Sequence, residues 1–152
     1  MTRKKALLMV VAVISLLSAS FTEGKTEDLT ERWVLYGKSA DGNSYYDRVR
    51  IRLMSPAVIQ AWDKMEYSEI GKDKDIQWRK NEKLVINGYN LLAMTFTLFE
   101  IDCKKSIITT ISTVDYDSKM NIIDLFSSNN PGKYPIVSGS RGELLSRKIC
   151  PK

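Results

Sequence analysis

The chain has 152 residues, 43% of them hydrophobic, and its 23 lysines and arginines outnumber its 18 aspartates and glutamates. A length of this order supports one domain. The sequence contains no histidine, which excludes Ser-His and Cys-His nucleophile pairs, a histidine general base and imidazole metal ligands.

The N-terminus has the pattern of a secretory signal. Three cations at positions 3–5 precede a largely apolar run over 6–17, and small residues follow at 18–20. This order predicts a signal peptide over 1–20, cleaved after Ser20. The alternative is a retained anchor, but the apolar run is shorter than the about 20 residues that a membrane span needs. We expect an exported protein, in the periplasm or at the cell surface, with no stable membrane span after cleavage.

The basic character of the chain lies largely in this signal. Without the three cations at positions 3–5, the formal net charge falls from +5 to +2. The remaining lysines and arginines are interspersed with carboxylates, so the charge pattern does not predict nucleic-acid binding.

Two cysteines remain after export, Cys103 and Cys150. An even number in an oxidising compartment favours a disulfide, which would close a loop of about 48 residues and stabilise the fold by about 4 kcal/mol. Two free thiols are the alternative. A metal site is disfavoured because no CxxC pair is present, and we expect neither a metal nor a cofactor.

The first half of the chain predicts extended structure after a flexible segment over 21–31. Strand formers and turn residues then alternate in a way that predicts a hairpin and two further short strands before position 66. These segments are 33–38 with 44–47 around a turn at 39–43, then 49–53, and 57–65 after a break at Pro56.

Residues 67–83 are rich in charge and predict a long exposed connection. Trp78, Arg79 and Lys80 within it form a candidate ligand-binding loop, because an aromatic side chain beside cations can stack on a base or a sugar. The alternative is a solvated loop whose tryptophan packs against the domain, and interspersed acidic residues favour that alternative.

Residues 91–103 form the clearest predicted strand. Met94, Phe96 and Leu98 alternate toward one side, whereas Phe99, Ile101 and Cys103 fall on the other. Either a bulge shifts the phase near Leu98, or both faces of a central strand are covered. Residues 106–114 and 122–126 predict the strands that follow.

The chain ends in a predicted helix. Ser140 and Glu143 fit a capping box, and Leu144, Leu145 and Ile149 then share one face. The predicted class is therefore α+β: an antiparallel sheet of five or six strands, with the C-terminal helix packed on one face and tied by a Cys103–Cys150 disulfide. Exposed edge strands leave a homodimer open.

Outside 67–83, Asp115-Tyr116-Asp117 is the acidic cluster that could supply a carboxylate pair. We interpret it as a solvated turn rather than the carboxylate pair of an active site. With no histidine to act as a base, the sequence predicts a protein that is not an enzyme.

Short motifs occur in a characteristic order after residue 32. They are Trp33-Val34-Leu35, Asp41-Gly42, Tyr45-Tyr46-Asp47, Ile51, Trp62, Phe99-Glu100-Ile101-Asp102-Cys103, Pro131-Gly132, Tyr134-Pro135-Ile136, Gly139-Ser140 and Cys150. The series resembles the surface-adhesin protein E-like family of bacterial envelope domains. The resemblance implies one domain of this kind over 32–152, with an antiparallel sheet, a C-terminal helix and a disulfide joining Cys103 to Cys150.

In the named member of that family, the domain binds host extracellular-matrix proteins at the cell surface. The resemblance thus implies an adhesin-like binding module for proteins or matrix components. Three features depart from the family: the signal lacks a lipobox cysteine, Arg50 stands where serine is usual, and the 67–83 connection is longer. Without a lipid anchor, surface display needs another explanation. The alternative is a periplasmic structural or stress-related protein with no extracellular ligand.

Overall fold

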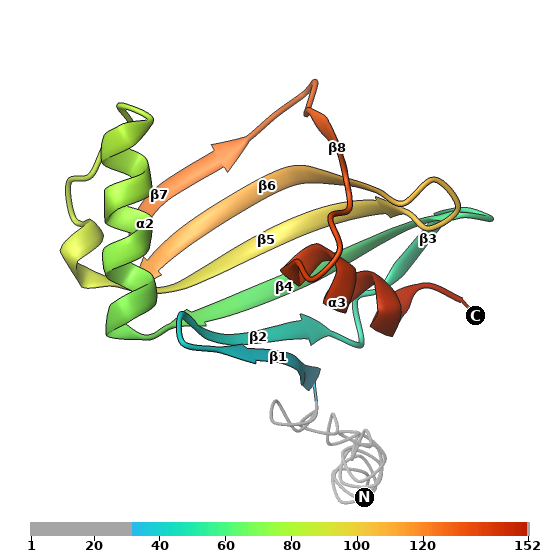
Figure 1. Cartoon of the computed structure of the whole chain (residues 1–152), viewed down its shortest axis with the longest axis horizontal. Coiled ribbons are helices and arrows are strands. Elements are labelled where there is room, and N and C mark those ends of the chain that lie inside the picture. The colour runs from blue at the N-terminus through green and yellow to red at the C-terminus, as the bar shows by residue number, and fades with distance from the viewer. Residues whose placement is uncertain (1–31, 152) are drawn as a thin grey trace, which may run out of the picture.

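A computed structural model describes residues 32–151 (Figure 1). The predicted signal peptide (1–20) and the predicted flexible segment (21–31) lie outside the described residues. The elements are β1 (Trp33–Ser39), β2 (Gly42–Asp47), β3 (Arg52–Ser55), β4 (Val58–Tyr67), α2 (Glu69–Asn81), the 3₁₀ helix η2 (Tyr89–Leu91), β5 (Leu92–Asp102), β6 (Ile107–Asp117), β7 (Ile122–Ser127), β8 (Lys133–Pro135) and α3 (Arg141–Ile149).

One antiparallel sheet carries the fold. Six strands follow in the order β1-β2-β4-β5-β6-β7, while β3 pairs with β4 and β8 pairs with β6. The described residues therefore form eight strands, and the predicted five or six is wrong. The reason is that β4 and β6 have 10 and 11 residues. Each is long enough to pair with two short strands along the edge that faces away from β5.

β3 corresponds to the short strand predicted over 49–53, whereas β8 has no counterpart among the predicted segments. β8 has only three residues and ends on proline. β3 begins at Arg52 instead of residue 49, because the carboxylate of Asp47 accepts hydrogen bonds from the N–H groups of Val49 and Arg50, both at 3.1 Å. These bonds hold the chain in a turn before the strand can start.

Residues 67–83 are mostly helical, not the predicted long connection. Ser68 caps α2 by accepting a hydrogen bond from Gly71 N at 3.1 Å, and Arg79 and Lys80 occupy the last turn, where cations suit the helix dipole. Gly71 packs against the β1–β2 turn so closely that a Cβ there would lie 1.9 Å from the carbonyl oxygen of Asp41. The helix was missed because its surface is mainly polar and its apolar periodicity is weak.

The long strand β5 is covered on both faces. A register shift does occur opposite Leu98 and Phe99, as one of the two alternatives predicted, but the extra residue, Ile111, belongs to β6. From Met94 to Asp102 the side chains of β5 therefore keep their alternation, whereas a second register shift at Ala93 lies at the start of the strand. On one face, Phe96 stacks edge-to-face between Trp33 at 5.4 Å and Tyr116 at 5.5 Å between ring centroids.

The opposite face of the sheet carries both helices (Figure 1). At one end, α3 buries Leu145 and Ile149 against an apolar cluster formed by Tyr36, Ile59, Ala61 and Ile101. At the other end, α2 lies over β5, β6 and β7. Among the helices of residues 32–151, none has the length and apolar character needed to cross a membrane.

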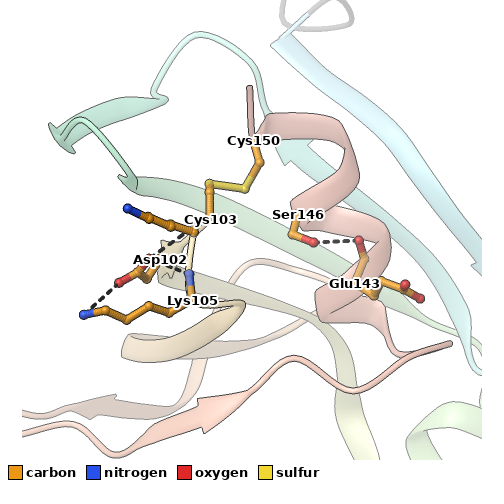
Figure 2. Close-up of a disulfide and its surroundings, with 7 residues drawn as sticks. Asp102, Cys103, Lys105, Glu143, Ser146 and Cys150 are labelled. Atoms are coloured by element: carbon orange, nitrogen blue, oxygen red, sulfur yellow. Dashed lines mark hydrogen bonds and ion pairs between the residues drawn. A yellow bond between two sulfur atoms is a disulfide. The ribbon is translucent and has the colours of Figure 1, made fainter. Parts of the chain in front are cut away.

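A disulfide fixes the end of α3 to the sheet, as predicted. Cys103, just after β5, bonds Cys150 at the C-terminal end of the helix, with a Cα–Cα distance of 5.7 Å (Figure 2). At the other end of α3, Ser140 accepts a hydrogen bond from Glu143 N at 3.2 Å. The carboxylate of Glu143 binds Gly139 N at 2.7 Å, one residue earlier than a capping box requires. The C-terminal helix packed on one face is thereby confirmed.

Candidate functional site

A groove lies beside α2 on the helix-covered face. It has a volume of about 870 Å³. Thr95, Thr113 and Asp115 of β5 and β6 form its floor, α2 supplies one wall, and residues 124–134 supply the other. The groove exists because α2 and α3 cover the two ends of the sheet face and leave the sheet between them open.

Arg79 is the central charge of this groove. Its guanidinium lies 2.9 Å from Asp75 and 2.8 Å from Asp115, and 3.6 Å from Asp124. The same group stacks 3.7 Å from the ring centroid of Tyr89. One cation is thus shared among three carboxylates, which leaves the cluster with a formal charge of −2.

Two hydroxyl groups complete the bonding of Asp115. The Tyr89 hydroxyl donates to Asp115 Oδ2 at 2.5 Å, and the Thr95 hydroxyl donates to Asp115 Oδ1 at 2.5 Å. The Tyr89 oxygen also lies 3.2 Å from Asp124 Oδ2. Because a buried carboxylate needs such donors to offset its lost hydration, this arrangement explains how Asp115 can be buried.

The prediction of a solvated turn at residues 115–117 is therefore wrong for Asp115. Asp115 lies within β6 and is buried on the groove side. Asp117 caps the turn after β6, where it accepts hydrogen bonds from the backbone N–H groups of Lys119 and Asn121, both at 2.8 Å. Regular alternation would place residues 115 and 117 on the same face, but the pairing of β6 with β7 shifts register directly after Asp115, and Asp117 is the last residue of β6.

Burial shifts the pKa of two groups in the cluster, Asp75 and Tyr89. It raises the pKa of Asp75 above the usual 3.8, although Arg79 opposes this shift. Burial and the neighbouring Asp115 also raise the pKa of Tyr89, so its phenol stays protonated and remains a donor. The cluster is thus built from groups that satisfy one another, and none of its carboxylates stands free as a base.

The rim of the groove is apolar and exposed. Trp78 has 53% of its surface exposed, Phe126 has 52% and Tyr134 has 63%. Leu84 and Val85, also largely exposed, follow α2 along the same rim. A groove with aromatic edges and a negatively charged floor suits a partner that combines apolar side chains with a cation.

The structure brings two of the three predicted binding residues to this groove. Trp78 and Arg79 line it, whereas Lys80 is an exposed residue on α2 outside the lining. Arg79 is half-buried and engaged by carboxylates, so it supports the floor instead of offering a free cation. That these residues bind a ligand stays a prediction.

A second polar cluster lies under α3. Asp63 is fully buried, receives a hydrogen bond from the Tyr36 hydroxyl, and lies 3.0 Å from a guanidinium nitrogen of Arg141. The contact with Arg141 is an ion pair outside hydrogen-bond geometry, so Asp63 Oδ2 accepts no hydrogen bond from the described residues. Burial raises the pKa of Asp63, and Arg141 opposes that rise. The cluster anchors the first turn of α3 to β4.

Neither cluster has the composition of a metal centre. Within residues 32–151, no group of three or more His, Cys, Asp or Glu side chains is arranged to hold a metal ion. In the groove, the space among the carboxylates is occupied by the Arg79 guanidinium. The groove therefore has an acidic floor whose donors are engaged within the cluster, below an exposed aromatic rim.

Comparisons with known proteins add one structural likeness. No protein-family model matches the chain, and no curated protein matches it. The chain is similar to the crystal structure of protein E from non-typeable Haemophilus influenzae, with a TM-score of 0.49 and 12% identity, covering 82% of this chain and 78% of that one. A likeness of this size carries no argument about function. Membership of the surface-adhesin protein E-like family stays a prediction from the sequence.

Sequence reasoning missed Tyr89, Thr95 and Asp124 as parts of the site. They come from three separate elements, and none has a local signal of function. The signal that could have pointed to the site is Asp75 four residues before Arg79, a spacing that places an ion pair on one helix face.

Proposed function

We propose that the chain is an exported, non-enzymatic binding module of the bacterial envelope, adhesin-like, whose groove holds a segment of a protein or matrix component. The observation that carries this proposal is the exposed aromatic rim of the groove. It lies above an acidic floor whose hydrogen bonds and ion pairs are made within the cluster. The predicted signal peptide, together with a disulfide that suits an oxidising compartment, supports export.

The groove favours a particular class of segment. Its acidic floor and the half-exposed Asp124, with 49% of its side chain accessible, attract a lysine or an arginine. The ring edges of Trp78 and Phe126 offer apolar contact to the residues beside that cation. A short basic and apolar peptide segment meets both requirements, whereas an acidic segment would be repelled.

A peptide-display selection on the purified exported protein tests the groove. We expect enriched peptides to combine a basic residue with apolar ones. Trp78→Ala and Asp124→Asn should each weaken the binding of a selected peptide by about tenfold or more, as loss of a contact worth about 1.4 kcal/mol would do. Ile70→Ala and Asp73→Asn, at exposed positions of α2 outside the groove, are the matched controls. Equal affinity of all four variants would rule out the groove as the binding site.

Protease treatment of intact cells tests the location. An adhesin-like module should be cleaved while the outer membrane is intact. A domain that becomes sensitive only after the outer membrane is broken would instead support the alternative, a periplasmic structural or stress-related protein with no extracellular ligand. Binding to immobilised extracellular-matrix extract, lost in Trp78→Ala, would assign the ligand class.

A further inference from the structure

The segment that leads into β3 alternates arginine with apolar residues: Arg48-Val49-Arg50-Ile51-Arg52-Leu53-Met54. The segment is exposed throughout, with Leu53 at 67% and Met54 at 53% exposure. Its first part forms an ordered turn, because the buried carboxylate of Asp47 accepts hydrogen bonds from Val49 N and Arg50 N. Figure 1 shows that the hairpin of β3 and β4 projects at the end of the sheet away from α2.

Two further elements bring cations to this end of the sheet. Val58 at the start of β4 pairs with Asp102, and Cys103 N donates to Ala57 O at 2.8 Å, so the β3–β4 and β5–β6 turns lie side by side. The second turn carries Lys104 and Lys105. The disulfide then places the last turn of α3, with Arg147 and Lys148, beside that turn (Figure 2).

We name this surface the basic end. Its cations are Arg50, Arg52, Lys104, Lys105, Arg147 and Lys148, all exposed. Asp102 pairs with Lys105 at 3.6 Å, and Glu143 pairs with Arg147 at 2.7 Å. The other four cations form no ion pair within residues 32–151. The basic end therefore carries a net positive charge, whereas positive and negative side chains are nearly equal in number over the rest of the domain.

From this combination we infer that the basic end docks on an anionic phospholipid membrane. Exposed aliphatic side chains beside cations fit the boundary between headgroups and acyl chains, where arginines contact phosphates while Leu53 and Met54 enter the apolar layer. A nucleic acid would use the cations but has no counterpart for the exposed aliphatic tip.

This docking keeps the groove free. The helix α2, which forms one wall of the groove, lies at the end of the sheet opposite the β3–β4 hairpin (Figure 1). A domain seated on a membrane through the basic end would present α2 away from the lipid. The inference does not depend on the groove binding a peptide, since the two surfaces share no residue.

Vesicle flotation with the purified exported protein tests the inference. The probes are vesicles of phosphatidylglycerol with phosphatidylethanolamine, and vesicles of phosphatidylcholine alone. We expect binding to the anionic vesicles only, and weaker binding as salt rises, because charges beyond about 8 Å are screened at physiological ionic strength. The double variant Arg50→Glu/Arg52→Glu should bind at least about 25-fold more weakly, from about fivefold per cation near an anionic surface.

Two further variants separate the contributions. Leu53→Ser/Met54→Ser keeps the charge and should lose the binding that survives in high salt. Lys80→Glu/Lys119→Glu changes the net charge by the same amount away from the basic end and should bind like the unchanged protein. Arg50→Gln/Arg52→Gln repeats the test without introducing new charge if the reversed variant fails to fold.

The inference is overturned by any of three results. They are equal binding to anionic and neutral vesicles, equal loss in the Arg50/Arg52 and Lys80/Lys119 variants, and binding to a DNA duplex or to an acidic polypeptide in place of vesicles. A failure of vesicle binding leaves the peptide selection unaffected, so the two proposals can fail separately.

Discussion

The two helices on the covered face of the sheet are held in place by different interactions. At the α3 end, Leu145 and Ile149 enter an apolar cluster and a disulfide ties the helix to the strand beneath it. At the α2 end, the Arg79 guanidinium is shared among three carboxylates, and the surface beside it stays open as a groove. The closed end stabilises the fold, whereas the polar end keeps a defined surface available for a partner.

This division follows from the length and composition of the helices. With nine residues, α3 is too short to be stable alone and depends on packing and on the covalent bond at its end. With 13 residues and a mainly polar surface, α2 is held by its cap, by the contact of Gly71 with the β1–β2 turn and by ion pairs. Substitutions at the two ends should therefore lower the free energy of unfolding by different amounts.

The largest effect should come from the disulfide. Cys103→Ala and Cys150→Ala should each lower the free energy of unfolding by about 4 kcal/mol, because the unfolded chain then regains the freedom of a long loop. The double variant should cost little more than either single one, since both changes remove the same bond. Urea unfolding of the disulfide-bonded protein and of the three variants measures this. Two additive losses would mean that the cysteines act separately.

Loss of the central cation should be the largest effect at the α2 end. Arg79→Met removes the charge that compensates the buried Asp115 and should lower the free energy of unfolding by about 3 kcal/mol. Lys80→Met is the matched control, because Lys80 is exposed and outside the cluster, and it should cost no more than about 0.5 kcal/mol. If the two variants unfold at the same urea concentration, the network contributes no stability.

The helix cap at the α3 end should contribute less to the free energy of unfolding than the disulfide or Arg79. Ser140→Ala leaves Glu143 N without its side-chain acceptor and should cost about 1 kcal/mol. Ser138→Ala, two residues earlier and exposed, is the control and should leave the thermal midpoint nearly unchanged. Equal shifts in the two variants would show that the cap has no net effect.

The smallest effect is a pH dependence at the same helix end. The N–H of Gly139, and then Arg147, hold the pKa of Glu143 below its usual 4.5. A lowered pKa in the folded state adds stability above the unfolded-state pKa, and that stability is lost as pH falls through the folded-state pKa. Glu143→Gln should therefore lower the melting temperature slightly at pH 7, and this difference should shrink as pH falls below the usual pKa of 4.5. A difference that does not change with pH would contradict this assignment, and Glu82→Gln serves as a charge control.

Much of the α3 end could be predicted from the sequence. The two cysteines, the Ser140 cap and the apolar face of Leu145 and Ile149 are local patterns or simple counts. The alternation of Phe99, Ile101 and Cys103 also predicted a covered face, because side-chain direction in a strand follows directly from position. The ordered series of short motifs after residue 32 resembled a family, and no comparison has shown that membership.

The α2 end could not be predicted in the same way. Residues 67–83 were expected to form a connection, since a polar helix has no strong apolar period to identify it. Asp115 was expected to be solvated because a charged side chain is usually exposed. The residues that surround it, Arg79, Tyr89 and Thr95, come from other elements, so the local sequence does not reveal them. The basic end was missed for a related reason: its cations are separated in the sequence and meet only through strand pairing and the disulfide.

The sequence by itself determined the antiparallel α+β class, the C-terminal helix and the covalent tie, because these depend on residue spacing over a few turns or strands. The tertiary structure alone decided which polar residues became a site. Arg79 and Asp115 are 36 positions apart, and their 2.8 Å contact depends on how α2 lies over β6 and on the register that brings β5, β6 and β7 together. Local patterns report which way a side chain points along its own element, but the partner it meets is set by the packing of other elements.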